Sequence, residues 1–287
     1  MPLAGTSLQA LRRLVLPCYP LTMLSTDQLR EHLQLGLRAV AAAEEPILRY
    51  FRSQDIGLIH KGDGSPVTLA DKAAEAAIRH VLRAGTPEFD ILGEEEGSLD
   101  RGRRHRWVID PIDGTISFSR GIPLFGSLLA LEDREEERSL LGIINLPALG
   151  ETYSGGPALG TWCGEQRLTI QDSSKALQRG HEADIIAAGD PLWFDQAGVG
   201  DDYAVLLKNN RLLRGYTDCF GHAMVLRGGL GAVVDPGLSF WDFAATTALI
   251  EGAGGAVWSR PSLLEGSTDL ILGKPSLVEH LRIQLGW

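Results

Sequence analysis

The sequence predicts a mixed α/β protein, and two patterns support this fold class. In the second half of the chain, short apolar runs typical of strands alternate with segments of helical periodicity. In the first half, helical segments are mixed with two apolar runs, 125–131 and 140–146, which a charged turn joins into a predicted hairpin. The 287 residues are enough for one large domain or two packed halves.

The first predicted element is a long helix over 26–52. Leucines recur in it at helical spacing, and Ser25 or Thr26 can cap it. A segment rich in turn residues follows at 61–66. The other elements expected in the first half are a helix from 67 to about 82 and strands at 89–93 and 107–110. Those expected in the second half are strands at 185–188, 212–216, 233–234, 256–258 and 270–273, and helices at 220–227, 241–251 and after 276.

We expect the chain to divide into three parts. Residues 1–24 form an N-terminal extension that is expected to be poorly ordered. A signal peptide is the less favoured interpretation of this stretch, because residues 18–20 interrupt its apolar part and no small-residue cleavage site follows. The remaining parts are an N-terminal α+β half at 25–172 and a C-terminal α/β half at 173–287.

The composition excludes several classes of protein. Acidic residues outnumber basic ones by 37 to 27, and the net charge of −10 argues against a nucleic-acid binder. The same excess of carboxylates suits a site for hard cations. Three dispersed cysteines without CxxC spacing indicate neither a disulfide framework nor a zinc site, and favour a reducing cytoplasm. No apolar run approaches the roughly 18 residues of a membrane helix.

The most informative motif is Trp107-Val-Ile-Asp110-Pro-Ile-Asp113-Gly-Thr115. An apolar run typical of a buried strand ends there in two carboxylates, a turn and a hydroxyl. Asp110 and Asp113 would repel each other, and a pair of divalent cations offsets such repulsion and can bind phosphate. The N–H groups of Gly114 and Thr115, if they begin a helix, would point at an anion. For the two aspartates alone, a solvated Asp-Gly turn is the alternative.

Three further acids could complete a metal site, and each has a structural alternative. Glu94 follows an apolar strand and could hold a metal or orient a water, but it also begins a run of glutamates typical of a solvated face. Asp71 forms a near capping box with Thr68, although it could also hold the hydroxyl of Thr115 ready as a base. Asp242 begins a predicted helix, where an acid is often an N-cap.

The order of these motifs along the chain resembles the inositol monophosphatase family, the magnesium-dependent, lithium-sensitive phosphomonoesterases. The resemblance covers roughly residues 27–287. It rests mainly on the Asp-Pro-Ile-Asp-Gly-Thr block at 110–115, which is highly specific. The Trp-Asp pair at 241–242 and the Gly-rich segment at 251–255 support it. The resemblance implies a layered α-β-α-β-α sandwich and a homodimer.

The resemblance also implies two or three Mg²⁺ ions per active site. The implied ligands are Glu94, Asp110 and the Ile112 carbonyl for the first ion, and Asp110, Asp113 and Asp242 for the second. A third, weaker ion would share Glu94. Asp71 and Thr115, with Glu94, would activate the attacking water, and Gly114 and Thr115 would contact the phosphate. Bound metal lowers the pKa of water and clamps phosphoryl oxygens, so no covalent phospho-enzyme is required.

Substrate choice is expected to depend on acids away from the metals. By resemblance, Asp218 lies where inositol-directed members carry a small neutral residue, and Asp235 lies where they carry a substrate-contacting glutamate. Asp113 is also expected to contact substrate. Two acids near the leaving group suit a cationic alcohol better than a neutral polyol. As an alternative, Asp218 and Asp235 could be a cap and a turn acid.

The substrate favoured by these residues is L-histidinol phosphate, which carries an ammonium and an imidazole. The string Thr217-Asp-Cys-Phe220 and the pair Ser117-Phe118 are similar to the histidinol-phosphate phosphatase branch of the family. Thr217, Phe220 and Ile116 depart from the pattern of that branch. The expected partner is a small phosphorylated substrate, with no nucleic acid or membrane involved. Alternatives are an inositol or other sugar-alcohol monophosphatase, a 3′-phosphoadenosine phosphate phosphatase, and a non-catalytic metal- or phosphate-binding protein.

Overall fold

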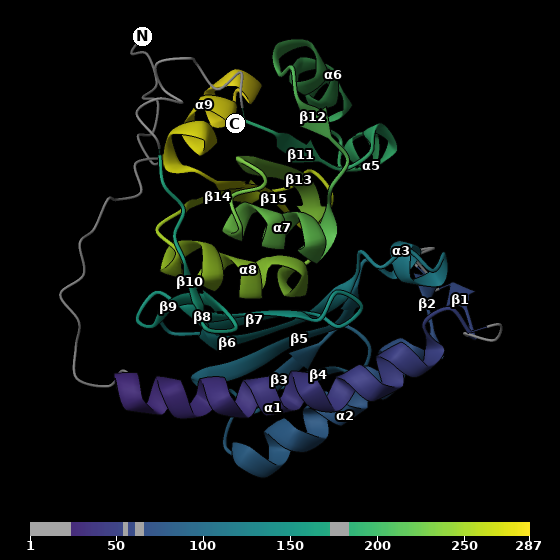
Figure 1. Ribbon diagram of the computed structural model, residues 1–287, viewed down its shortest axis with the longest axis vertical. Coiled ribbons are helices and arrows are strands. Elements are labelled where there is room, and N and C mark those ends of the chain that lie inside the picture. Colours follow the sequence, from purple (N-terminus) through teal and green to yellow (C-terminus); the bar gives the residue numbers. More distant parts are fainter. Residues whose placement is uncertain (1–23, 54–56, 61–65, 173–183) are drawn as a thin grey trace, which may run out of the picture.

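The computed structural model describes residues 24–53, 57–60, 66–172 and 184–287, which form alternating layers of helix and sheet (Figure 1). The order of the layers is α-β-α-β-α, which confirms the predicted fold. The helices of these layers are, in that order, α1 (Thr26–Tyr50) and α2 (Leu69–Gly85), then α7 (Asp218–Leu226) and α8 (Phe240–Gly252), then α5 (Pro191–Gln196), α6 (Gly200–Asn209) and α9 (Pro275–Leu285).

The first sheet has eight strands in the order β10-β9-β8-β7-β6-β5-β3-β4. The predicted hairpin is confirmed as the antiparallel pair β6–β7, whereas β3 and β5 are parallel neighbours. The strands are β3 (Asp90–Gly93), β4 (Gly97–Leu99), β5 (His105–Asp113), β6 (Gly126–Asp133), β7 (Arg138–Leu146), β8 (Glu151–Gly156), β9 (Gly160–Cys163) and β10 (Gln166–Leu168).

The second sheet has five strands in the order β12-β11-β13-β15-β14. The neighbours β12, β11 and β13 are parallel, and β15 is antiparallel to β13 and β14. The strands are β11 (Ile186–Ala188), β12 (Leu213–Arg214), β13 (Ala232–Leu238), β14 (Ala256–Pro261) and β15 (Thr268–Gly273). The elements outside the two sheets and their helices are the strand pair β1 (Ile59–His60) and β2 (Pro66–Val67) and the short helix α3 (Thr115–Ser119).

The first helix begins where its capping residue predicts. The Ser25 hydroxyl accepts the N–H of Gln28 at 3.2 Å, and the Gln28 side chain accepts the N–H of Ser25 at 2.9 Å. This reciprocal capping box satisfies two N–H groups that have no acceptor inside the helix. Leu29, Leu35 and other apolar side chains on one face of α1 are buried against α2 and the first sheet.

The hydrophobic interior follows the layers. One cluster joins α1 and α2 to the first sheet, a second fills the space around α7 and α8 between the sheets, and a third lies under α5, α6 and α9. The middle layer is therefore apolar on both faces, as expected for helices covered by a sheet on each side. No helix of the described residues is long and apolar enough to span a membrane.

Several boundaries differ from the sequence prediction. Helices α5 and α6 were not predicted, because Gly198 and Gly200 interrupt their periodicity and Leu192 and Leu207 are exposed. The strand expected at 212–216 is only two residues long. Helix α7 begins two residues before the predicted 220–227. The predictions for residues 1–23 and for the turn residues 61–65 lie outside the described residues.

Candidate active site

Two parallel strands bring Glu94 and Asp110 together. Gly93 of β3 pairs in register with Ile109 of β5, and the N–H of Glu94 donates to the Ile109 carbonyl at 3.2 Å. Parallel strands end at the same edge of a sheet, so the residues that follow the pair leave that edge side by side. Glu94 and Asp110 both line the same cavity.

A β-bulge places Asp113 beside Asp110. On β6 the partners of these two residues are two positions apart, whereas on β5 they are three apart. In a regular strand, side chains three positions apart point to opposite faces, and one extra residue corrects this. The hydroxyl of Ser127 donates to the Pro111 carbonyl at 2.7 Å and satisfies it at the bulge. Both aspartates therefore line the same cavity.

Gly114 turns the chain from β5 into α3. Its φ of 82° is left-handed, and a Cβ there would lie 2.9 Å from the Leu124 carbonyl oxygen, so glycine is required. Helix α3 begins at Thr115, whose hydroxyl donates to the Ile112 carbonyl at 3.0 Å. Gly114, Thr115 and Ile112 line the cavity, and the first N–H groups of α3 have no acceptor within their helix.

Asp71 serves as the third residue of the capping box of α2. The backbone N–H and the hydroxyl of Thr68 both donate to Asp71 Oδ2, at 2.7 and 2.5 Å. Asp71 is buried, and no hydrogen bond of the described residues joins it to Thr115. Burial raises the pKa of Asp71 to about 6 despite the Thr68 hydrogen bonds, and the charge of Glu94 contributes to the rise. The capping interpretation is confirmed, and the predicted role as a base stays a prediction.

A buried ion pair holds the turn that carries Glu94. Glu75 accepts the N–H groups of Glu95 at 2.8 Å and of Glu96 at 3.0 Å. The guanidinium of Arg79 donates to the same carboxylate at 2.7 Å. Both members of the pair are buried, so the negative charge that faces the turn is compensated. The sequence alone gave no indication of this support for Glu94.

The middle layer supplies the remaining acids. Asp242 lies in the first turn of α8, where its Oδ2 accepts the N–H of Ser239 at 2.8 Å. Ser239 is the N-cap, so the alternative of Asp242 as N-cap is wrong. At the start of α7 the N–H of Cys219 donates to the carboxylate of Asp113. The preceding residue, Asp218, has a left-handed φ of 57°, a conformation that aspartate tolerates better than most residues.

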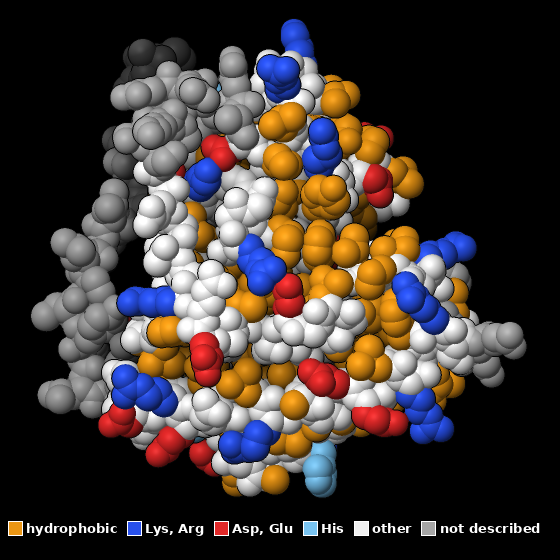
Figure 2. Space-filling view, viewed as in Figure 1, with side chains coloured by type: hydrophobic (Ala, Val, Ile, Leu, Met, Phe, Trp, Pro, Cys, Tyr) orange, Lys and Arg blue, Asp and Glu red, His pale blue; other side chains and the backbone are white. Residues whose placement is uncertain are grey.

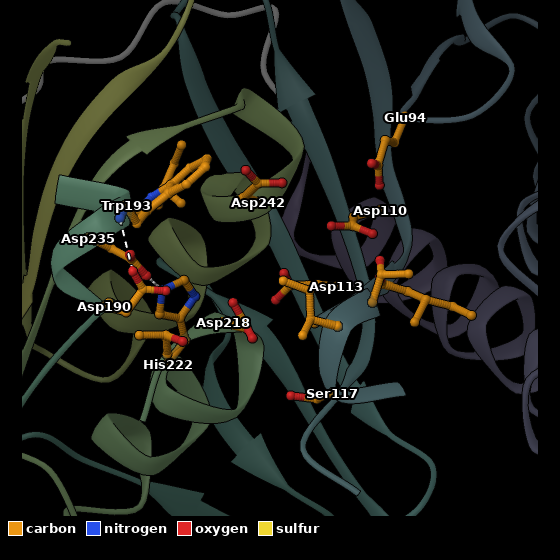
Figure 3. A pocket seen from close by; sticks show the side chains of 17 residues that line it. Glu94, Asp110, Asp113, Ser117, Asp190, Trp193, Asp218, His222, Asp235 and Asp242 are labelled. Carbon is orange, nitrogen blue, oxygen red and sulfur yellow. Dashed lines mark hydrogen bonds and ion pairs between the residues drawn. The ribbon is translucent and has the colours of Figure 1, made fainter. Parts of the chain in front are cut away.

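These side chains line one cavity of about 380 Å³ (Figure 3). Figure 3 shows Glu94 and Asp110 on one side and Trp193, Asp190, Asp235 and His222 on the other. Asp113, Asp218 and Asp242 lie between these two groups. The predicted site residues that line the cavity are Glu94, Asp110, Ile112, Asp113, Gly114, Thr115, Asp218, Asp235 and Asp242. Asp71 is the predicted site residue that does not line it.

The acids of the cavity disfavour one another's charge. Burial, and then the charges of neighbouring acids led by Glu94, raise the pKa of Asp110 well above its usual value. Burial, and then the charge of Asp218, raise the pKa of Asp113 well above its usual value. Burial raises the pKa of Asp218 to about 6 and that of Asp235 well above its usual range. The lining residues in the described part of the chain include no Lys or Arg to balance these carboxylates.

The residues present fit a divalent cation. Oδ1 of Asp110 is buried and has no hydrogen-bond partner. A buried carboxylate oxygen without a donor is costly, and a cation removes both this cost and the repulsion between neighbouring acids. Donors that are all oxygens suit Mg²⁺. Across the described residues, no three His, Cys, Asp or Glu side chains converge closely enough to form a preformed metal cage.

Asp190, Trp193 and His222 are polar or aromatic lining residues that were not assigned a role from the sequence. Asp190 caps α5 by accepting the N–H of Trp193 at 3.0 Å, and the Trp193 indole donates to the Pro236 carbonyl at 2.7 Å. His222 of α7 is buried and points into the cavity. The pair Asp190-Pro191 is a recognisable helix start, but a single Trp or His in an apolar segment carries no functional pattern.

The fold and this acidic cavity define a layered α/β protein with a candidate cation site. Comparison with known proteins narrows the class. The inositol monophosphatase family matches over residues 28–273. A histidinol-phosphatase of Chlorobaculum parvum is 34% identical over 237 residues, which are 82% of this chain and 89% of the relative. A histidinol-phosphatase of Streptomyces coelicolor is 33% identical, covering 78% of this chain and 85% of the relative.

The solved structures agree with the sequence relatives. The structure of an inositol monophosphatase from Zymomonas mobilis superimposes with a TM-score of 0.76 and 30% identity, over 90% of this chain and 98% of that chain. The chain belongs to the inositol monophosphatase family, which confirms the resemblance. Members of this family are generally Mg²⁺-dependent, and the family identifies the chain as a phosphoric monoester hydrolase of small phosphorylated substrates.

Proposed function

We propose that the protein is a Mg²⁺-dependent phosphatase that hydrolyses L-histidinol phosphate to L-histidinol and phosphate. The observation that carries the substrate proposal is the position of Asp218. Its carboxylate lies within 3.3 Å of where a side chain on Gly114 would be, and it contributes to the raised pKa of Asp113. An additional acid at the junction of the two sides of the cavity favours a leaving alcohol that carries positive charge.

The carboxylates supply the chemistry by holding cations. Glu94, Asp110 and the Ile112 carbonyl would hold one Mg²⁺, and Asp113 and Asp242 would share a second with Asp110. When bound, Mg²⁺ supplies a water of lowered pKa and neutralises phosphoryl oxygens. Without a Lys or Arg among the described lining residues, cations and N–H groups are the available partners for a phosphate.

The remaining residues would position the reacting groups. The N–H groups of Gly114 and Thr115 would bind the phosphate at the start of α3. Thr115, with Asp71 and Glu94, would orient the water that adds to phosphorus as the ester bond breaks. The Thr115 hydroxyl donates to the Ile112 carbonyl, so its oxygen keeps a lone pair for the water. Asp71 would accept the proton that the attacking water gives up, and the leaving alkoxide would take a proton from solvent and depart as the alcohol toward Asp218 and Asp235.

The test is phosphate release from three esters, with and without Mg²⁺. The esters are L-histidinol phosphate, inositol 1-phosphate and glycerol 2-phosphate. We expect Mg²⁺-dependent release from histidinol phosphate with a kcat/KM about 100-fold above that of inositol phosphate, the range that two close charge interactions provide. A preference for inositol phosphate would overturn the substrate assignment. Release from none of the esters would favour the non-catalytic binding protein.

Inositol monophosphatase activity is the second candidate, and one observation favours it. The Zymomonas mobilis relative described above is an inositol monophosphatase with a fold that matches most of this chain. The two candidates differ in what they need from Asp218, because a neutral polyol gains nothing from an additional negative charge. We also propose a cytoplasmic homodimer, which the family resemblance and the dispersed cysteines support.

A further inference from the structure

His222 and Asp235 lie together on the side of the cavity opposite Glu94 and Asp110 (Figure 3). His222 comes from α7 in the middle layer, and Asp235 comes from β13 of the second sheet. Their exposed fractions are 1% and 4%, so both polar side chains are buried. Two consecutive elements that lie in different layers therefore bring an imidazole and a carboxylate to the same wall.

One nitrogen of His222 has no partner. Nδ1 lies 3.0 Å from the Thr246 hydroxyl, a normal hydrogen-bond distance. Nε2 is buried without a hydrogen-bond partner, and the nearest acidic atom, Oδ2 of Asp235, is 3.9 Å away. That distance is too long for a hydrogen bond. A buried polar atom without a partner calls for an explanation, and in a cavity wall a ligand provides one.

The charge state of the pair determines which ligand fits. Burial lowers the pKa of His222 to about 4, so the ring is neutral near pH 7 and carries one proton. When Nδ1 donates that proton to the Thr246 oxygen, Nε2 keeps a lone pair. The wall then presents two acceptors, Nε2 of His222 and Oδ2 of Asp235. Burial raises the pKa of the Asp235 carboxyl group, and a cationic group bound beside it favours the ionised, accepting form.

We propose that Nε2 of His222 and Oδ2 of Asp235 together accept hydrogen bonds from the primary ammonium group of the leaving alcohol. A nitrogen about 2.9 Å from each atom fits between acceptors separated by 3.9 Å. An ammonium has three N–H donors on one atom, whereas an imidazolium nitrogen or a hydroxyl has one. His222 is thus a specificity-determining residue for an amino-alcohol phosphate, and this role rests on the proposed function.

The neighbouring residues keep this wall in place. The Trp193 indole is anchored at 2.7 Å to the carbonyl of Pro236, which directly follows Asp235. Gly189 has no side chain to cover Asp235, and a Cβ there would lie 3.6 Å from Oδ1. The ammonium site is therefore open toward the cavity and bounded by the indole, and Asp190 adds a second acid to this wall.

The test compares His222→Asn with His222→Gln. The Asn amide reaches the position of Nδ1 but not that of Nε2, whereas the Gln amide reaches the position of Nε2. Each variant is assayed with L-histidinol phosphate and with its deamino analogue, which lacks only the ammonium. We expect the wild type to prefer the amine substrate by about 30-fold or more in kcat/KM, since each hydrogen bond to a charged group contributes roughly tenfold.

His222→Asn is expected to reduce that preference about tenfold, mainly through KM for the amine substrate. His222→Gln is expected to keep most of the preference. The kcat/KM for the deamino analogue is expected to change little in either variant. An equal loss for both substrates would show a structural role and overturn the proposal. An unchanged preference in His222→Asn would also overturn it.

The wild type and Asp235→Asn keep the proposal testable if His222→Asn does not fold. A wild type that hydrolyses both esters equally well refutes the ammonium site without any variant, while the phosphatase function stands. Asp235→Asn is expected to lose the amine preference as His222→Asn does, and a retained preference would contradict the shared site. A wild type inactive on histidinol phosphate would instead refute the proposed function.

Discussion

The two sides of the cavity are both acidic, but the neighbours of their acids differ. On the side of the first sheet, Asp110 and Asp113 are held close by a bulge and have no basic partner. On the side of the second sheet, Asp235 lies beside a neutral His222 and an anchored Trp193. The first arrangement fits any phosphate ester once cations are present. The second distinguishes one leaving alcohol from another, so chemistry and specificity depend on different parts of the chain.

The largest expected effect is that of Asp110→Asn on the cation side. We expect activity on every ester to fall at least about 10³-fold, because a ligand shared by two cations is lost. The metal-free fold is expected to survive, since the substitution removes one charge from a repelling group of buried acids. Phosphate release and thermal unfolding measure the two effects. Asp201→Asn on the exposed surface of α6 is the control, and retained activity in Asp110→Asn would refute the cation assignment.

Asp71→Asn distinguishes catalysis from helix capping. If Asp71 acts as a base as well as a cap, kcat of Asp71→Asn is expected to fall about 10²-fold for all esters, within the range of general-base contributions. If Asp71 is a cap alone, Asp71→Asn is expected to lose only about 1 kcal/mol in the free energy of unfolding. Steady-state kinetics and denaturant unfolding of the same preparation separate the two. Unchanged kcat with reduced stability would leave Asp71 as a capping residue.

Asp218→Asn tests the acid that lies between the two sides of the cavity. We expect kcat/KM for histidinol phosphate to fall about tenfold and that for inositol phosphate to stay level or rise, because only the first leaving group is cationic. Asn tolerates the left-handed φ of 57° nearly as well as Asp, so this variant isolates the charge. Asp218→Ala, which adds backbone strain, is the comparison. Equal changes for both esters would remove Asp218 from substrate selection.

His222 and Asp110 are expected to give the stability opposite pH dependences. The pKa of His222 is about 4 in the folded protein, against 6.5 for an ordinary histidine. The unfolded chain therefore binds this proton more tightly, so stability is full above pH 6.5 and is lost as pH falls toward 4. The raised pKa of Asp110 has the opposite sign, with stability lost as pH rises.

Unfolding free energies of the wild type and His222→Gln at several pH values measure the His222 contribution. We expect the wild type to lose about 2–3 kcal/mol more than the variant between pH 7 and pH 4.5. Carboxyl groups that titrate in both proteins cancel in this difference. A difference independent of pH would contradict a neutral, buried His222.

The sequence predicted the cation side better than the other side. Asp110, Asp113 and Gly114 are adjacent in the chain, and the motif that contains them constrains the local backbone, so their proximity could be inferred. In the structure, the bulge in β5 and the register of β3 with β5 bring these residues together. The support of the Glu94 turn by Glu75 could not be inferred, because it depends on a contact between a helix and a loop that are 20 residues apart.

The specificity side was only partly predictable. Asp218 and Asp235 were found by resemblance, but His222 has no neighbour in the sequence that marks it. Its role depends on Asp235 and Thr246, which are contributed by a strand and another helix. Helix α5, which carries Trp193, was missed because it is short and its apolar side chains are divided between the interior and the surface.

The most direct test of this division is a Mg²⁺ titration of the wild type with two esters, L-histidinol phosphate and inositol 1-phosphate, measured as kcat/KM. If the cation side acts on both esters and the other side distinguishes their leaving alcohols, the two titrations have the same Mg²⁺ midpoint. Their kcat/KM values at saturating Mg²⁺ are then about 100-fold apart. Plateaus of similar height, or midpoints that differ between the esters, would contradict the account.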